Sequence, residues 1–434
     1  MIKEQVNVGI LGLGTVGSGT AKIIQENGDN IRLKVGAGIK VAKVLVRDLN
    51  RARAVDIAEE NLTTKAEDIV ENPQIDIVVE VMGGIEPART YILKAIANGK
   101  SIVTANKELM AKHGKEILEA AEKNKVAVQF EASVGGGIPI IRPMKRCLAA
   151  NNIEQIMGII NGTTNYILTK MTDEGMDFQE VLAEAQKAGY AEADPTADVG
   201  GYDAAYKITI LSSIGFSSRV NFDDVYFEGI DKITAQDIEY AKDLGYTIKL
   251  LAIAKESADG IEIRVHPTMI SSNHPLAAVK DVFNAIFVKG DAVGEVMFYG
   301  RGAGQMPTGS AIVADVIDIS RDLIHGIQSR LNCTCFVDKK VKHMDDIESS
   351  YYVRLDCLNK PGVLSQIAGV FGKNNVGLCS VIQKGSKVGK ELAEIVWVTY
   401  QVKEKDLQEA LRELKSLDIV KQISNVIRVE GGVQ

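Results

Sequence analysis

The first 130 residues alternate short apolar runs with stretches in which apolar residues recur at helical spacing. Five β-branched runs have the length of buried strands and cover residues 6–11, 41–46, 75–81, 101–104 and 126–130. Residues 87–97 and 108–122, which lie between these runs, show the helical period. Because strands that alternate with crossover helices pair in parallel, this pattern predicts a parallel sheet covered by helices.

The middle of the chain has a mixed pattern. Helical spacing covers residues 165–170, 178–188 and 202–214, whereas strand-length runs cover residues 249–254, 261–266, 282–289 and 296–299. We therefore expect a second domain of mixed α and β structure over residues 134–304. Residues 300–323 begin with glycines and continue as a long helical pattern. We expect this helix to pack on the first domain, which would then comprise residues 1–133 and about 305–327.

The C-terminal part is short and regular. Residues 328–349 are polar and turn-like, so we interpret them as a linker. Residues 350–434 then predict strand 351–357, helix 363–373, strands 377–383 and 392–402, helix 405–414 and strand 420–429. The order β-α-β-β-α-β is that of the ferredoxin-like fold. The chain as a whole is expected to be an α/β protein with three domains.

Composition excludes several classes of protein. The 434 residues are 46% hydrophobic and 25% charged, as in soluble globular proteins. A net charge of −7 gives no reason to expect binding to nucleic acid or to an anionic membrane. The first residues enter a strand pattern directly, so we expect no signal peptide and a cytoplasmic location.

Five cysteines form no disulfide framework. Cys333 and Cys335 form a C-x-C pair, but a second pair is missing nearby and the chain has only five histidines. We interpret them as ordinary thiols rather than as a metal site.

A glycine motif follows the first predicted strand and opens a helix. In Gly12-x-Gly14-x-x-Gly17, the three glycines permit a tight turn, the approach of a pyrophosphate and close packing of helix on strand. The free N–H groups at the helix start favour a phosphate. The motif predicts a dinucleotide-binding (Rossmann-type) domain; the alternative is such a domain that has lost its ligand.

The end of the second strand bears on the identity of the dinucleotide. Arg47 suits the 2′-phosphate of NADP through a charge-assisted hydrogen bond, whereas Asp48 suits the ribose hydroxyl of NAD. We favour NADP and keep NAD as possible. Arg51 and Arg53, close behind, are alternatively solvated charges at a helix start.

An acidic loop precedes Lys207. The stretch EADPTADVGGYDAAYK contains four carboxylates, and Asp203 and Lys207 would share one face of a helix at positions i and i+4. A surface ion pair there would contribute only about 0.3–0.5 kcal/mol, so stability explains the arrangement poorly. With Glu192, the pair would form a pocket for an ammonium group beside a lysine that donates a proton to an alkoxide. A divalent metal held by the carboxylates is the rival interpretation.

Three further positions have two interpretations each. Lys107 directly follows a strand, where ligands of α/β sheets gather, or it is a surface lysine that opens a helix. Glu131 precedes three glycines whose bare carbonyls could hold a hard cation, or it is structural. Residues 161–164 either cap a helix or bind a carboxylate with free N–H groups.

Six strings together resemble homoserine dehydrogenases in their order and spacing. They are GLGTVGSG, TANKELM, FEASVGGGIPI, GIINGTTNYIL, GYAEADPTADVGGYDAAYK and FYGRGAGQMPTGSAIVAD. Residues 350–434 resemble an ACT domain, a small-molecule regulatory module, as in the long form of this family. The resemblance implies reversible NAD(P)H-dependent reduction of L-aspartate 4-semialdehyde to L-homoserine, in threonine, methionine and isoleucine biosynthesis.

The resemblance also implies residue roles. Lys207 would be the proton donor in reduction, and Lys107 would support proton transfer. Which of the two lysines is the base in oxidation stays open. Substrate contacts are implied for Glu192, Asp203, Gly162, Thr163 and Thr164. Cofactor contacts are implied for Gly12, Leu13, Gly14, Thr15, Val16, Gly17, Arg47, Thr104, Lys107, Gly189 and Gly304.

A monovalent cation, sodium, is implied at Glu131 and the carbonyl oxygens of Val134, Gly136 and Ile138. The family further implies a homodimer or homotetramer that associates through the substrate domain. In the ACT domain, the implied effector is an amino acid, threonine being the family's expectation. It would meet Asn359, Gly362, Val363 and Leu364.

The effector loop departs from the family at Asn359, where the ACT signature has Asp. Asn can still cap the helix and contact an amino group, but without full charge. Two other functions remain: a different NAD(P)-dependent amino-acid or amino-aldehyde dehydrogenase, and a non-catalytic sensor of cofactor and amino acid. A lysine among carboxylates disfavours the sensor, which needs no proton donor.

Overall fold

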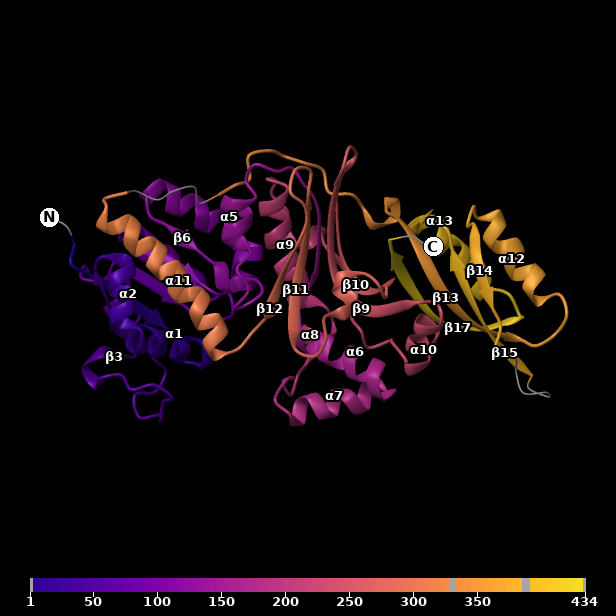
Figure 1. Cartoon of the computed structure of the whole chain (residues 1–434), viewed down its shortest axis with the longest axis horizontal. Helices are drawn as coiled ribbons and strands as arrows, with labels where there is room; N and C mark the ends of the chain where they lie inside the picture. Colours follow the sequence, from indigo (N-terminus) through magenta and orange to yellow (C-terminus); the bar gives the residue numbers. More distant parts are fainter. Residues whose placement is uncertain (1–2, 328–332, 385–390, 432–434) are drawn as a thin grey trace. The chain divides into compact units, whose positions relative to one another are not determined.

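The computed structural model describes residues 3–327, 333–384 and 391–431. The chain separates into two compact units, labelled by element in Figure 1. The first unit comprises Met1–Gly162, Asp203–Asp223 and Phe283–Lys339, and the second comprises Thr163–Tyr202, Asp224–Val282 and Lys340–Gln434. The expected division into three domains stays a prediction, and residues 328–332 of the expected linker lie outside the described residues.

A six-stranded parallel sheet organises the first unit, in the order β3-β2-β1-β4-β5-β6. Its strands are β1 (Gln5–Leu11), β2 (Gly38–Leu45), β3 (Leu62–Thr63), β4 (Ile77–Glu80), β5 (Ser101–Thr104) and β6 (Val128–Gln129). This order is that of a dinucleotide-binding fold, and it confirms the parallel sheet predicted from the alternating pattern. The two-residue strand β3 was not predicted because it is too short to show a period.

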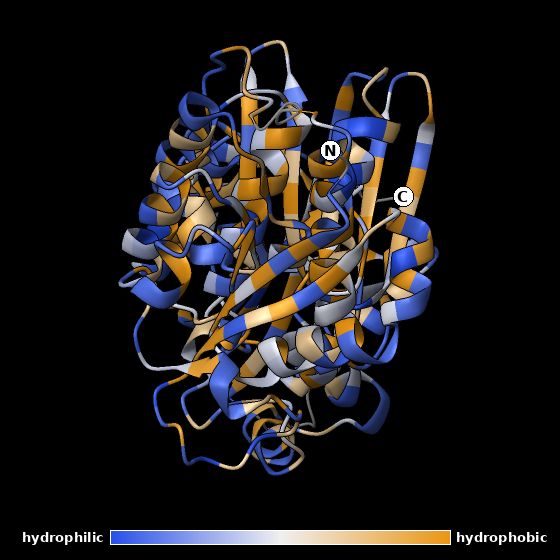
Figure 2. Ribbon diagram, turned by 90° about the vertical axis from the view of Figure 1, so that its left-hand side faces the viewer, coloured by the Kyte–Doolittle hydropathy of each residue, from blue (hydrophilic) through white to orange (hydrophobic). Residues whose placement is uncertain are grey.

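Helices cover this sheet. They are α1 (Thr15–Glu26), α2 (Gly28–Val35), α3 (Glu67–Val70), α4 (Ala88–Ala97), α5 (Lys107–Asn124) and α11 (Gln305–Ile324). Every residue of β4 and β5 is buried, as expected for parallel strands covered on both faces. In Figure 2, hydrophobic and hydrophilic residues alternate along the helices, since each helix buries only one side.

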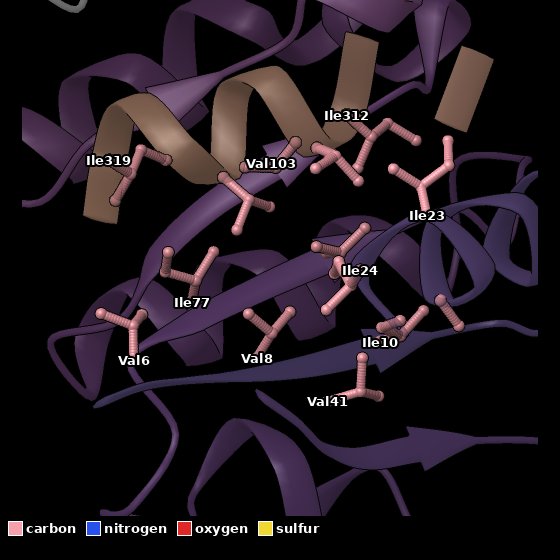
Figure 3. Packing of buried hydrophobic residues seen from close by; sticks show 14 of the residues in the cluster. Val6, Val8, Ile10, Ile23, Ile24, Val41, Ile77, Val103, Ile312 and Ile319 are labelled. Carbon is pink, nitrogen blue, oxygen red and sulfur yellow. The ribbon is translucent and has the colours of Figure 1, made fainter. Parts of the chain in front are cut away.

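The helix α11 packs on the first sheet although it lies far along the chain, as the sequence predicted. Figure 3 shows Ile312 and Ile319 of α11 facing Val103 of β5 and Ile23 of α1 in one apolar cluster. Glycines let α1 and α11 approach closely. A Cβ at Gly19 would lie 2.2 Å from the carbonyl oxygen of Gln305.

The first unit also contains α9 (Tyr202–Gly215), except its first residue, and an antiparallel group of three strands. These strands are β7 (Ile153–Ile159), β11 (Phe283–Gly290) and β12 (Gly294–Arg301), with β11 in the middle. The sequence predicted β11 and β12 but not β7, in which polar Glu154 and Gln155 interrupt the apolar run.

The second unit holds the mixed region and the C-terminal module. Its helices are α6 (Gly162–Glu174, whose first residue belongs to the first unit), α7 (Phe178–Lys187), α8 (Thr196–Val199), α10 (Ala235–Asp243), α12 (Val363–Lys373) and α13 (Glu404–Lys415). Its strands are β8 (Tyr226–Phe227), β9 (Tyr246–Ser257), β10 (Gly260–Ser271), β13 (Glu348–Leu358), β14 (Leu378–Ile382), β15 (Leu392–Thr399), β16 (Val402–Lys403) and β17 (Val420–Glu430).

The last four long strands lie in the order β17-β13-β15-β14, with α12 and α13 packed around Trp397 and Phe371. This arrangement confirms the predicted ferredoxin-like module. β17 also pairs in parallel with β10 of the same unit, at Thr268–Arg428 through Ile270–Glu430. Among the residues that the structure describes, no helix is both long and apolar enough to cross a membrane.

Candidate functional site

Two lysines meet one carboxylate in the first unit. Lys107 is the first residue of α5, directly after β5, and its Nζ lies 2.6 Å from Oδ1 of Asp203. Lys207, one turn along α9 from Asp203, places its Nζ 2.6 Å from the other oxygen, Oδ2. The helical spacing predicted the second contact, and the fold adds the first.

The end of β7 completes this cluster. Asn161 donates to Oδ2 of Asp203 at 2.9 Å, and the carbonyl oxygen of Ile160 accepts from Nζ of Lys207 at 2.6 Å. Sequence reasoning missed the Ile160 carbonyl, because a backbone acceptor leaves no mark in the sequence. It recognised residues 161–164 only as a cap or a carboxylate site.

Burial gives this cluster its electrostatic character. Asp203 and Lys207 are almost fully buried, while the side chain of Lys107 keeps 43% of its exposure. Burial alone would raise the pKa of Asp203, but the positive charges of Lys207 and Lys107 hold that pKa well below its ordinary value. The cluster therefore presents an anchored ammonium group that is suited to donate a proton, and a second one in contact with solvent.

A buried glutamate fixes the start of α5. Glu80, at the end of β4, accepts from the hydroxyl of Thr104 at 2.7 Å and from the N–H of Met82 at 2.8 Å. Burial raises the pKa of Glu80, and these hydrogen bonds partly offset the rise. Asn106 then caps α5 by accepting from the N–H of Leu109. Thr104 thus links Glu80 to the turn that carries Lys107. Sequence reasoning missed Glu80, because it ends an apolar run.

The glycine motif has the shape of a phosphate cradle. Gly12 has a φ of +104°, and a Cβ at Gly17 would lie 2.1 Å from the carbonyl oxygen of Gly12. A Cβ at Gly14 would meet nothing within 4 Å, so space is open in front of the turn. The helix begins at Thr15 without a side-chain cap, which leaves its first N–H groups for a ligand. The glycine motif therefore fits a dinucleotide pyrophosphate. Leu13 and Val16, within the motif, are partly buried and pack on the apolar core.

Arg47 and Asp48 are both exposed just beyond β2, at the carboxyl edge of the sheet. Arg53 donates to the carbonyl oxygens of Leu49 and Asp48, so it holds the loop together rather than facing a ligand. Arg47 takes part in no ion pair among the described residues, so its guanidinium is available to a 2′-phosphate.

Glu131 lies in a buried turn. Its carboxylate accepts from the N–H groups of Ile140, Ile141 and Arg142 at 2.6–2.7 Å. Nearby, the residues Val134, Gly136 and Ile138 are buried. No turn or loop hydrogen bond of the described residues ends on the carbonyl oxygens of these three. Carbonyl oxygens of buried residues that receive no turn or loop hydrogen bond among the described residues fit a cation. Glu131 also keeps one acceptor position on Oε2.

The other predicted positions are placed as follows. Gly162 and Thr164 lie in the first turn of α6, and Thr163 donates to the carbonyl oxygen of Tyr190 at 2.8 Å. Gly189, with a φ of +78°, ends α7, and Gly304, with a φ of +123°, is the N-cap of α11. Both glycines are therefore required by the backbone itself.

Glu192 is exposed in the loop before α8, within the second unit, and its contact with substrate stays a prediction. In the C-terminal module, Gly362 occupies the N-cap position of α12. Contact of Asn359 with an amino-acid effector stays a prediction. Val363 and Leu364 open α12, with Val363 buried and Leu364 exposed, so the loop keeps an accessible helix start.

Family models match three parts of the chain. The model described as homoserine dehydrogenase, NAD binding domain, matches residues 12–131, the homoserine dehydrogenase model matches 139–317, and the ACT domain model matches 351–418. The homoserine dehydrogenase of Synechocystis sp. is 51% identical over 434 residues, covering 98% of this chain and 99% of that protein.

Solved structures agree. A homoserine dehydrogenase from Thiobacillus denitrificans matches with a TM-score of 0.93 at 44% identity, covering 98% of each chain. A hyperthermophilic archaeal homoserine dehydrogenase in complex with NADPH matches with a TM-score of 0.63 at 29% identity, covering 73% of this chain and 98% of that one.

Proposed function

The chain belongs to the homoserine dehydrogenase family and is an NAD(P)-dependent oxidoreductase acting on CH–OH groups, and we propose that Lys207 is its proton donor. The observation that carries this proposal is the buried carboxylate of Asp203, which joins both lysines. A carboxylate with two ammonium groups is a costly arrangement to bury for stability alone.

The residues act on the aldehyde of L-aspartate 4-semialdehyde. When bound, the reduced nicotinamide supplies a hydride to the aldehyde carbon. Lys207 donates a proton to the aldehyde oxygen as negative charge develops there. Asp203 and the carbonyl of Ile160 hold the Lys207 ammonium in position, so little reorganisation is needed. Lys107 shares the same carboxylate and reaches solvent, so it can return a proton to the cluster.

We propose that Asp203 mainly orients the lysines. Its two oxygens already accept hydrogen bonds or ion pairs from Lys107, Lys207 and Asn161, and its side chain is 5% exposed. We propose that Glu192, which is exposed and carries a full negative charge, binds the substrate's amino group together with Thr163 and Thr164.

NADP is the proposed cofactor. The N–H groups at the start of α1 would hold the pyrophosphate, and Arg47 would pair with the 2′-phosphate. The complex of the archaeal relative with NADPH supports this choice. A preference for NADP over NAD is tested by comparing the KM values of NADPH and NADH.

A sodium ion is proposed at Glu131 with the carbonyl oxygens of Val134, Gly136 and Ile138. Its expected effect is structural, because the ion would fix the segment between β6 and β7. Turnover measured in sodium chloride and in choline chloride tests this proposal. If Glu131→Gln shows the same ratio of turnover in the two salts as wild type, the ion site is refuted.

The C-terminal module is proposed to bind an amino acid, with threonine as the first candidate, and the enzyme to act as a homodimer or homotetramer. The cytoplasmic location of the protein stays a prediction from the sequence. Titration of activity with threonine and other amino acids tests the effector, and sedimentation tests the assembly.

One assay tests the proposed substrate. NADPH and NADH consumption is followed with L-aspartate 4-semialdehyde, with other amino-aldehydes and with 2-oxo acids. We expect turnover with the semialdehyde to exceed the others by at least about a hundredfold, since even one missing methylene costs roughly 10- to 200-fold and lost polar contacts cost more. Equal or higher turnover with another carbonyl compound would indicate a different dehydrogenase, and no turnover with any would favour a sensor.

A further inference from the structure

A small cavity lies in the first unit, and the residues of the lysine–carboxylate cluster do not line it. It has a volume of about 30 Å³ and opens between α5, α9 and residues 333–335. Its lining includes two cations, Lys145 and Arg219, and the described residues that surround it contribute no carboxylate. A cavity of this size holds a molecule of one or two non-hydrogen atoms.

The sulfur of Cys333 accepts two hydrogen bonds at this cavity. A guanidinium N–H of Arg219 donates to Sγ at 3.1 Å, and the backbone N–H of Cys335 donates to the same atom at 3.5 Å. Donors of this kind, one of them charged, stabilise negative charge on sulfur. Cys333 is therefore placed as the nucleophile of the pair.

Cys335 has the complementary environment. Its thiol donates to the carbonyl oxygen of Ser213 at 3.7 Å, and burial raises its pKa to about 11, so it stays protonated. Neither cysteine is in a disulfide, and both are half-buried, so small solutes reach them. The contact between Cys333 Sγ and the N–H of Cys335 shows that the first side chain folds back over the second residue.

Thr334, between the two cysteines, lines the cavity with an unsatisfied hydroxyl. The residue is 8% exposed, and its Oγ1 has no hydrogen-bond partner among the residues that the structure describes. A buried hydroxyl without a partner calls for a small polar ligand. Thr334 and Arg219 therefore line the same cavity with donors that can polarise an O–O bond.

We propose that Cys333 and Cys335 form a thiol pair that hydrogen peroxide oxidises to an intrachain disulfide. The Cys333 sulfur attacks one peroxide oxygen and the O–O bond breaks. The leaving oxygen takes a proton and departs as water, and Cys333 becomes a sulfenic acid. The Cys335 sulfur then attacks Sγ of Cys333; its thiol proton leaves with the hydroxyl as water, and the S–S bond forms. The two thiols lose two electrons and the peroxide gains them.

The position of the pair couples it to the active cluster. The cavity is bounded by α5, which begins at Lys107, and by α9, which carries Lys207. Forming the disulfide draws Cys333 away from Arg219, on the segment that follows α9. Oxidation is therefore expected to lower turnover, and a dithiol reductant is expected to restore it.

The test exposes the full-length protein to hydrogen peroxide and maps the oxidised cysteines by mass spectrometry. We expect a Cys333–Cys335 crosslink to form before Cys147, the exposed cysteine, is modified. In Cys335→Ser, dimedone should trap a sulfenic acid on Cys333. Oxidation of Cys147 at the same rate or faster, or absence of the crosslink, would overturn the proposal.

Two variants test the role of the cavity. Arg219→Met and the nearly isosteric Thr334→Val should form the crosslink about ten- to a hundredfold more slowly, since the first loses the hydrogen bond to the Cys333 sulfur and the second loses the hydroxyl proposed to bind the peroxide. An unchanged rate in both would overturn the role of these donors. Turnover is measured on the same samples; full turnover in completely crosslinked protein would refute the coupling to α5 and α9.

Discussion

Replacing Asp203 by asparagine isolates the charge that holds the two lysines. The variant keeps the shape of the side chain, but it removes the negative charge that faces Lys207 at 2.6 Å and Lys107 at 2.6 Å. Lys107 is 43% exposed and can turn to water, whereas Lys207 is 9% exposed and cannot. Lys207 keeps the carbonyl of Ile160 as an acceptor.

The expected cost follows from this asymmetry. Removing one partner of a buried ion pair costs about 3–5 kcal/mol, and the retained carbonyl places this variant near the lower value. A loss of about 3 kcal/mol corresponds to a fall in Tm of roughly 6–12 °C for a unit of this size. A buried ammonium without a counter-charge tends to lose its proton, so turnover should also fall by about a hundredfold or more.

Thermal unfolding and steady-state turnover measure these two effects. Asp194→Asn is the matched control, because Asp194 is an exposed carboxylate of the same acidic loop. Its Tm should stay within about 2 °C of wild type. Because the pKa of Asp203 is lowered in the folded state, its stabilisation is present above about pH 4 and is lost as the pH falls through the folded-state pKa. If Asp203→Asn has a wild-type Tm and turnover, the carboxylate does not anchor the lysines.

Gly14→Ala should fold normally, since its Cβ meets nothing within 4 Å, but should weaken cofactor binding at least about tenfold in a fluorescence titration. Gly17→Ala should instead lower the Tm, because its Cβ would lie 2.1 Å from the carbonyl oxygen of Gly12; the reverse pattern would contradict the cradle. Arg47→Ala should raise the KM for NADPH about tenfold and leave that for NADH unchanged, and equal changes would argue against a 2′-phosphate contact. Burial lowers the pKa of Lys249 to about 8, below its value in the unfolded chain. In urea unfolding, the free energy of unfolding of wild type relative to that of Lys249→Met should therefore rise by roughly 3 kcal/mol between about pH 8 and 10. A difference that stays constant with pH would show that Lys249 is not desolvated.

Periodicity predicted the parallel sheet, α9 and the C-terminal module because each has a strong and uniform pattern. The strand β7 escaped prediction although it ends beside Ile160 and Asn161, which complete the lysine cluster. Its run mixes Glu154 and Gln155 with apolar residues, since these polar side chains lie near one end, where burial is incomplete. A period cannot be read from so short a mixed segment.

The candidate site was predictable where residues are close in sequence. Asp203 and Lys207 are four residues apart on one helix, so their contact follows from helical geometry. The contact of Lys107 with Asp203 joins positions far apart in the chain and depends on how α5 and α9 pack, which no local pattern encodes. The role of Glu80 could not be predicted either. In the sequence, one carboxylate in an apolar strand looks like an exposed residue at the strand's end, and only the structure gives its hydrogen bond from the hydroxyl of Thr104.

The most direct measurement is the turnover of Lys207→Met with L-aspartate 4-semialdehyde, made together with its dissociation constant for NADPH. Methionine is similar in length to lysine and has no proton to donate. The kcat should therefore fall by about 10²- to 10⁴-fold, while the dissociation constant for NADPH stays the same. Lys107→Met, measured beside it, should lose less. Near-normal turnover in Lys207→Met would contradict proton donation by this lysine.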